Sequence, residues 1–166
     1  MKDARAVAFF ACMLLPGVAR AQSDAVHKRA VSEPVSQLVR QQLKPLLDEL
    51  MVAANAHDTD RFLAAYLHQP SLVMVFDGVV TKGWDNVRAL QLKWWNNGVS
   101  DVVYSEPVSP EITVLDRNAA VVTQQMTSTR TLTGGGTSNG KFAVTMVWQR
   151  LPEGWRIVQV HESTVR

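Results

Sequence analysis

The hydrophobic pattern of this 166-residue chain changes its period once, near Pro70. Before Pro70, apolar residues between Val35 and Ala54 recur at steps of three and four, which places them on one face of a helix. After Pro70, most segments alternate between apolar and polar residues, which is the period of a β-strand. Helices followed by a series of strands are typical of an α+β domain and not of alternating βαβ units.

Three helices are predicted, two of them before Pro70 and one after it. Pro45 interrupts the first apolar stripe, so it either kinks one helix or lies in the first turn of a second one. Asp58 or Thr59 is suited to cap the next helix, and Gly98 is expected to end the last one. The predicted helices cover residues 35–54, about 59–67 and 84 to about 96.

The second part is predicted to be a meander of strands. Asp77-Gly78 is a strong hairpin signal between the first two of them. The segment 133–140, TGGGTSNG, is expected to form a loose hairpin connection. The predicted strands cover residues 72–76, 79–81, 99–106, 111–115, 119–131, 141–151 and 155–165.

Residues 1–21 have the order of a secretory signal peptide. Lys2 and Arg5 precede an apolar run, and Ala19 and Ala21 supply the small residues of a cleavage site. The apolar run is shorter than the roughly 20 residues that a membrane-spanning helix needs. We therefore expect cleavage after Ala21 and a secreted or periplasmic protein with no membrane association. Residues 22–34 are expected to be a flexible arm, and residues 35–166 a single domain.

Composition excludes several classes of function for the cleaved chain. The full sequence has 17 Lys and Arg against 15 Asp and Glu, and cleavage leaves 14 of each. A neutral chain without a basic run argues against nucleic acid as a partner. Cys12, the single cysteine, lies in the leader, so disulfides, thiol catalysis and cysteine-bound metals are excluded. His57, His68 and His161 lack the spacing of metal ligands, and we expect no metal and no cofactor.

The segment Gly140–Ser163, GKFAVTMVWQRLPEGWRIVQVHES, resembles the closing hairpin of the SnoaL-like branch of the nuclear transport factor 2-like superfamily. Phe76–Val87, FDGVVTKGWDNV, is similar to the hairpin and helix start of the same branch. The resemblance implies a conical α+β barrel, in which a strongly bent, mostly antiparallel sheet wraps around about three N-terminal helices and leaves a cavity. It also implies a homodimer. The closing motif G-W-[RK]-I-V-x-x-H-x-S is matched by Gly154, Trp155, Arg156, Ile157, Val158, His161 and Ser163.

Three residues are candidates for acid–base chemistry. His161 matches the histidine of the motif, and an imidazole in a cavity could act as acid or base near neutral pH. A histidine that holds the end of the sheet by hydrogen bonds is the alternative. Asp77 could abstract a proton, or could be a turn residue that bonds its own backbone. Tyr66 could be a hydrogen-bond donor. The base position of ketosteroid isomerases falls near Val75, which is apolar.

Aromatic side chains could line a site for a small apolar or amphipathic molecule, or could simply form the core. Three functions stay open: an exported small-molecule-binding domain with an apolar, aromatic pocket that contains His161, a cofactor-independent lyase, isomerase or cyclase that uses His161 with Asp77 or Tyr66, and an oligomerisation module. The candidate ligand-binding residues are Phe76, Trp94, Trp95, Gln125, Trp148, Gln159 and Ser163.

Overall fold

The computed structural model describes residues 31–165, so the predicted leader and most of the predicted arm lie outside the described residues. None of the described helices combines the length and the apolar character that a membrane span requires. The helices and strands follow the predicted order. They are α2 (Glu33–Asn55), α3 (Thr59–Leu63), β1 (Val73–Phe76), β2 (Val79–Lys82), α4 (Trp84–Trp94), the 3-10 turn η1 (Asn96–Gly98), β3 (Val103–Ser105), β4 (Glu111–Asp116), β5 (Ala119–Thr131), β6 (Thr137–Leu151) and β7 (Gly154–Thr164).

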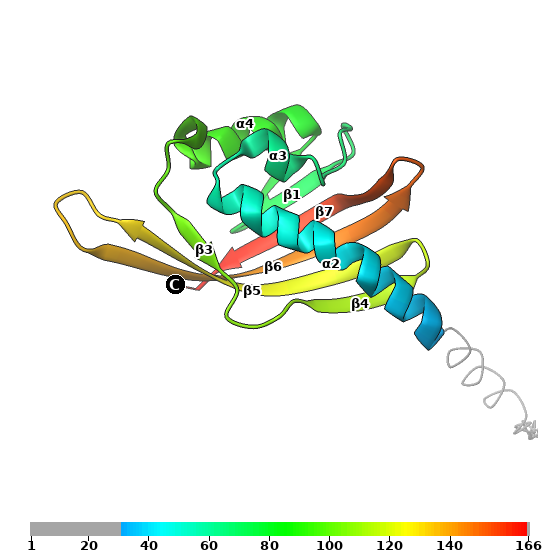
Figure 1. Ribbon diagram of the computed structural model, residues 1–166. Helices are drawn as coiled ribbons and strands as arrows, with labels where there is room; N and C mark the ends of the chain where they lie inside the picture. The colour runs from blue at the N-terminus through cyan, green and yellow to red at the C-terminus, as the bar shows by residue number, and fades with distance from the viewer. Residues whose placement is uncertain (1–30, 166) are drawn as a thin grey trace, which may run out of the picture. The chain divides into compact units, whose positions relative to one another are not determined.

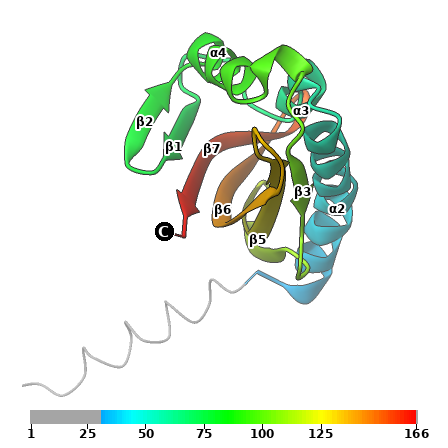
Figure 2. The ribbon, with the colours of Figure 1, turned by 90° about the vertical axis from the view of Figure 1, so that its left-hand side faces the viewer.

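The strands form one mixed sheet in the order β2-β1-β7-β6-β5-β3, with β4 also paired to β5. Only β1 and β7 run parallel among the described pairs, and the others are antiparallel. The sheet curls strongly and stays open, with α2 and α3 lying across its concave side and α4 beside the β1–β2 hairpin (Figures 1 and 2). The α+β class and the bent sheet around N-terminal helices are therefore confirmed.

Helix α2 is continuous through Pro45, which settles the two alternatives in favour of one helix. Its apolar stripe contributes Val39, Leu43 and Leu47 to the core, where they are 2%, 0% and 5% exposed. The helix begins at Glu33, with Pro34 in the first turn, where the missing amide hydrogen costs nothing. Burial of this stripe against the sheet is what stabilises so long an amphipathic helix.

The second helix is shorter than predicted. The side chain of Asp58 accepts a hydrogen bond from the amide of Arg61 and caps α3, as expected. After Leu63, however, the chain pairs with β7 instead of continuing the helix: the Leu67 amide donates to the Ile157 carbonyl at 2.9 Å, and the Ile157 amide donates to the Ala65 carbonyl at 2.8 Å. Backbone pairing with β7 therefore outweighs the local helical pattern of these residues.

The predicted connection 133–140 is also partly wrong. Strand β6 begins at Thr137, so the connection runs only from Leu132 to Gly136, and its three glycines, Gly134–Gly136, have φ angles of +100°, +96° and +86°. Ser138 and Asn139 pair with Arg130 and Thr129 of β5. Because the long β5 supplies an edge to pair with, these weak strand formers are extended. Conversely, β3 begins only at Val103, four residues later than predicted.

A β-bulge in β7 determines which side chains of this strand face inward. Trp148 of β6 pairs with Ile157, but its neighbour Val147 pairs with Gln159, so β7 carries one extra residue at Val158. Burial shifts by one position at the bulge: Ile157 is buried before it and Val160 after it. A strand of regular alternation would place Ile157, Gln159 and His161 on one face, and the bulge ends that arrangement at Val158.

Candidate functional site

A cavity of about 560 Å³ lies between the helices and the concave side of the sheet. Every layer of the domain contributes to its wall: α2, α3 and α4 on the helical side, and β1, β3, β5, β6 and β7 on the sheet side. Most of the lining side chains are apolar or aromatic, and the polar ones are few. This size and lining are those of small-molecule sites, which measure about 300–1,000 Å³.

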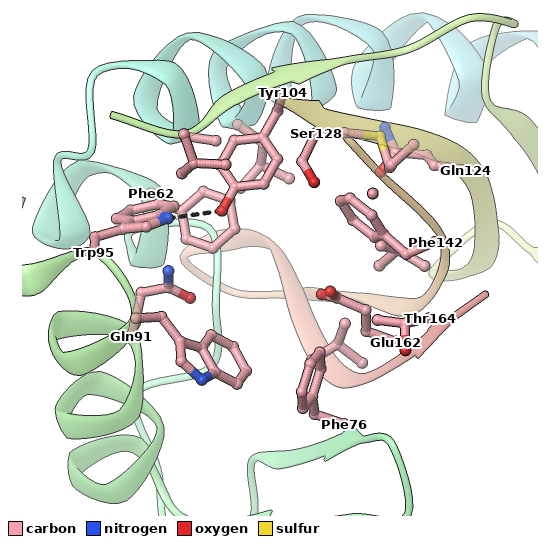
Figure 3. Close-up of a pocket in the computed structure, with 18 of the residues that line it drawn as sticks. Phe62, Phe76, Gln91, Trp95, Tyr104, Gln124, Ser128, Phe142, Glu162 and Thr164 are labelled. Carbon is pink, nitrogen blue, oxygen red and sulfur yellow. Dashed lines mark hydrogen bonds between the residues drawn. The ribbon is translucent and has the colours of Figure 1, made fainter. Parts of the chain in front are cut away.

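Aromatic rings form one wall of the cavity. The indole Nε1–H of Trp95 donates a 3.0 Å hydrogen bond to the hydroxyl oxygen of Tyr104, shown as a dashed line in Figure 3. Phe62 packs against the Trp95 ring edge to face with 5.1 Å between the centroids, and Phe142 approaches Tyr104 at 6.1 Å. These contacts fix the rings, so the wall is preorganised for a flat or apolar molecule.

Polar groups point into the same space from opposite sides. Figure 3 shows the carboxyl group of Glu162 facing the Tyr104 hydroxyl and the Gln91 amide across the cavity. The Tyr104 oxygen accepts from Trp95, so its own proton is available to another acceptor. Gln124 lines another part of the wall, and its amide nitrogen donates to the carboxylate of Glu106.

The electrostatics of the cavity favour protonated groups. Burial raises the pKa of Glu162 to about 7, and the negative charge of Asp77 adds to this effect. Burial, and secondarily the charge of Glu162, raises the pKa of the Tyr66 hydroxyl. Burial also raises the pKa of Tyr104, although its hydrogen bond from Trp95 opposes the shift. Both phenols are therefore donors at neutral pH, while Glu162 lies near the middle of its titration.

Of the three predicted acid–base residues, only Tyr66 lines the cavity, where it is 3% exposed. His161 is exposed and lies outside the cavity lining, so its expected orientation into the pocket is wrong. The bulge at Val158 is the physical reason, because it exchanges the faces of the residues that follow it.

Asp77 is also exposed and outside the cavity lining, and it takes the turn role. It lies in the β1–β2 turn with φ +43°, and its carboxylate accepts hydrogen bonds from the amide and the hydroxyl of Thr164 at 3.0 and 2.7 Å. These bonds fasten the hairpin to the end of β7.

The predicted ligand-binding residues divide in a similar way. Phe76, Trp94 and Trp95 line the cavity, and the rings of Phe76 and Trp94 lie 4.8 Å apart. Trp148 lies outside the lining and is fully buried in the core under the helices. The remaining three are exposed and outside the lining, on the outer face of the sheet: Gln125, Gln159 and Ser163.

Nine polar residues of the cavity lining were absent from the predicted site: Glu162, Tyr104, Gln91, Gln124, Lys93, Ser128, Arg130, Lys141 and Thr164. For Gln124 a signal existed, because it shares the parity of Val122 and Met126, which are both buried. For Glu162 the signal was weaker: apolar residues occupy both parities of β7, which is what a bulge within a strand produces. Nothing local indicates Tyr104 or Gln91, whose roles depend on how β3 and α4 meet the sheet.

No three His, Cys, Asp or Glu side chains in the described part of the chain gather closely enough to hold a metal ion.

The family model of the SnoaL-like domain matches residues 43–166, three quarters of the sequence. The chain belongs to the SnoaL-like domain family. The resemblance read from the closing hairpin is thereby confirmed, and the match includes every strand of the sheet. A comparison of this SnoaL-like protein with the curated proteins found no match.

Solved structures share the fold of this SnoaL-like domain. A nuclear transport factor 2 superfamily protein from Salmonella enterica serovar Typhimurium is 22% identical with a TM-score of 0.65, over 79% of this chain and 94% of that one. A nuclear transport factor 2-like protein from Shewanella oneidensis is 24% identical with a TM-score of 0.60, over 75% and 98%. A ketosteroid isomerase-like protein from Erwinia carotovora atroseptica is 16% identical with a TM-score of 0.61, over 76% and 95%. At these identities the likeness establishes the fold.

Proposed function

We propose that this SnoaL-like domain binds a small, largely apolar molecule in its cavity. The observation that carries the proposal is the cavity itself: about 560 Å³ walled by rings that are already held in place by their own contacts. An oligomerisation module with a vestigial cavity would instead be expected to fill this space with Phe76, Trp94 or Trp95. These three side chains form part of the wall and leave the volume open.

A neutral fluorescent probe tests the proposal. N-phenyl-1-naphthylamine, which brightens in apolar surroundings, is titrated into the protein and into Val144→Phe, which adds a ring to the cavity wall. We expect the affinity of Val144→Phe to be at least about tenfold lower, because the added ring occupies the space of the probe. The matched control is Val52→Phe on α2, at a position 52% exposed and outside the cavity lining, with unchanged affinity. Equal affinities in all three proteins would contradict the proposal.

A second candidate, proton transfer without a cofactor, is favoured by one observation. Glu162, with its pKa near 7, faces a tyrosine hydroxyl that has a proton to donate. In this reaction the Glu162 carboxylate takes a proton from a carbon next to a carbonyl. The electron pair moves to the carbonyl oxygen, which accepts the hydrogen bond of Tyr104, and the proton then returns to carbon. Here Glu162 has the role that was predicted for His161 or Asp77.

Hydrogen exchange separates binding from this chemistry. With 1-tetralone in D2O, a proton-transfer site would accelerate deuterium incorporation next to the carbonyl, measured by NMR. Glu162→Gln would abolish the acceleration, and His161→Ala would retain it. No acceleration by the native protein, or equal acceleration by Glu162→Gln, would leave binding as the function.

We also propose that the protein is exported and that residues 1–21 are removed. The supporting pattern is the charged start, apolar run and Ala19-x-Ala21 ending of the sequence. Intact-mass analysis of secreted or periplasmic material is expected to give a chain that begins at Gln22. Retention of residues 1–21 in that material would contradict this expectation.

The outer face of the sheet is our proposed surface for a homodimer. Thr145 lies near its centre, paired with Thr123 of β5 and His161 of β7. The outward residues nearest to Thr145 are uncharged: Gln125, Ala143, Gln159 and Ser163. The charged residues Lys141 and Arg156 lie farther along the same strands, away from this central patch. An uncharged surface of this kind can be desolvated without leaving buried charges. Native mass is expected to show a dimer that Thr145→Lys dissociates, and a monomeric native protein would contradict it.

A further inference from the structure

We infer that the molecule bound in the cavity is an amphipathic anion, whose apolar body lies against the aromatic wall and whose acidic group lies at a cationic mouth formed by Lys93, Arg130 and Lys141. This inference rests on the proposed binding function and specifies the chemical class of the ligand. Carboxylate, sulfonate and phosphate groups share the chemistry that such a mouth recognises.

The charge of the lining is asymmetric. Three cations contribute to the wall, and they come from separate elements: Lys93 from α4, Arg130 from β5 and Lys141 from β6. Glu162 is the single acidic residue among the described lining residues, and burial raises its pKa to about 7, so it is partly neutral at physiological pH. The lining thus carries a net positive charge, although the protein after removal of residues 1–21 would be formally neutral.

Charge and apolar surface are also separated in space. The three cations are exposed, whereas Met74, Met146 and Val160 of the same lining are 6%, 2% and 3% exposed. The cations therefore lie where the cavity meets solvent, and the apolar side chains lie at its inner end. Figure 2 shows α4, the end of β7 and the β5–β6 hairpin at the open end of the curled sheet. A ligand that matches this gradient is apolar at one end and anionic at the other.

The cations are available for a ligand. Neither Lys93 nor Lys141 forms an ion pair with another described residue. Arg130 has one contact, from its Nε to the Oδ1 of Asp101 at 3.9 Å, in which both side chains are about half exposed. Asp101 also accepts the Thr131 amide hydrogen at 2.8 Å, so its charge is shared. A long, exposed pair of this kind contributes little, and the guanidinium retains donors for a bidentate contact with an oxyanion.

Two probes with one skeleton test the inference. N-phenyl-1-naphthylamine is neutral, and 8-anilinonaphthalene-1-sulfonate adds a sulfonate to the same rings. We expect the anionic probe to bind more tightly to the native protein at low salt. In the double variant Lys93→Gln, Arg130→Gln its affinity is expected to fall about tenfold, while that of the neutral probe changes less than about twofold. Lys44→Gln, which removes an exposed lysine of α2 outside the cavity lining, is the matched control and is expected to change neither affinity.

The outcomes separate this inference from the proposed function. Equal affinities of the two probes for the native protein, or a preference that the double variant retains, would overturn the anionic ligand and leave binding in the cavity intact. Binding of both probes that Val144→Phe does not weaken would overturn the proposed function, and the inference with it. Loss of the preference in the double variant together with weaker binding to Val144→Phe supports both.

Discussion

His161 and Glu162 are neighbours on β7 whose side chains lie on opposite faces of the sheet. The imidazole is exposed on the outside, and the carboxyl group lines the cavity. This arrangement follows from the alternation of side chains in a strand and from the bulge at Val158. The bulge determines which face of the sheet each later residue of β7 occupies. In the proton transfer proposed above, the base is therefore Glu162, whose pKa is raised by burial to about 7.

Because the two side chains lie on opposite faces of the sheet, only the mutation of Glu162 is expected to affect binding in the cavity. His161→Ala is expected to change the affinity for N-phenyl-1-naphthylamine less than about twofold, because the imidazole does not reach the cavity. Glu162→Gln is expected to remove any pH dependence of that affinity between about pH 6 and 8, since the titrating group is lost. Fluorescence titrations across this range measure both. A larger loss in His161→Ala than in Glu162→Gln would contradict the assignment.

The raised pKa of Glu162 predicts a specific dependence of stability on pH. Between the ordinary value of 4.5 and the folded value of about 7, the folded state holds a proton that the unfolded state has released. The free energy of unfolding therefore falls by about 3 kcal/mol as pH rises through this window, and levels off above it.

Urea unfolding of the native protein and of Glu162→Gln isolates this effect, because the difference between the two curves removes the other titrating groups. Asp77→Asn is a further control: it removes a negative charge that raises the pKa, so the window should end at lower pH. Parallel stability curves for native protein and Glu162→Gln would contradict the raised pKa.

The hydrogen bond between Trp95 and Tyr104 predicts a measurable coupling. Trp95 is 2% exposed, so Tyr104→Phe leaves its indole N–H without the acceptor it has in the fold. We expect a loss of about 1–3 kcal/mol in the free energy of unfolding. In a double-mutant cycle with Trp95→Phe, the second loss should be smaller by about 1 kcal/mol when Tyr104 is already changed. Additive losses would show that the bond contributes nothing.

The bulge in β7 predicts that two deletions differ in cost. Deleting Val158 joins Ile157 to Gln159 and leaves regular alternation, with Val160 and Glu162 still facing inward. Deleting Gln125 from the regular part of β5 would turn Met126 away from the core. We expect the first protein to fold with a loss of about 1–3 kcal/mol and to bind the neutral probe. The second should lose more than about 4 kcal/mol or fail to fold, as judged by circular dichroism and thermal unfolding. Equal losses would contradict the assigned bulge.

Local patterns predicted the elements well where the signal is contained in a few neighbouring residues. The helical stripe of α2, the Asp58 cap, the Asp77-Gly78 turn and the extent of β5 all depend on such short-range chemistry. The predicted bounds were wrong where pairing with another strand determines the conformation. Thr137, for example, was predicted to lie in a loop but is extended, because it pairs with Thr131.

The same division holds for the cavity. Residue type and position were enough to predict four aromatic residues of the cavity: Phe76, Trp94, Trp95 and Tyr66. Large aromatic side chains near the contact between helices and sheet are usually buried in that contact. Gln125, Gln159, His161 and Ser163 were assigned to the wrong face, because the face of a strand residue depends on register.

The sequence by itself determined the order of helices and strands, the α+β class and the family, since these follow from periodicity, turn residues and a closing motif that are all local. Only the tertiary structure decided which side chains meet in the cavity. A single unpaired residue, Val158, moves Glu162 inward and His161 outward, and its position is set by how β6 and β1 hold the two edges of β7. Pairing between distant segments therefore fixes the chemistry of the cavity.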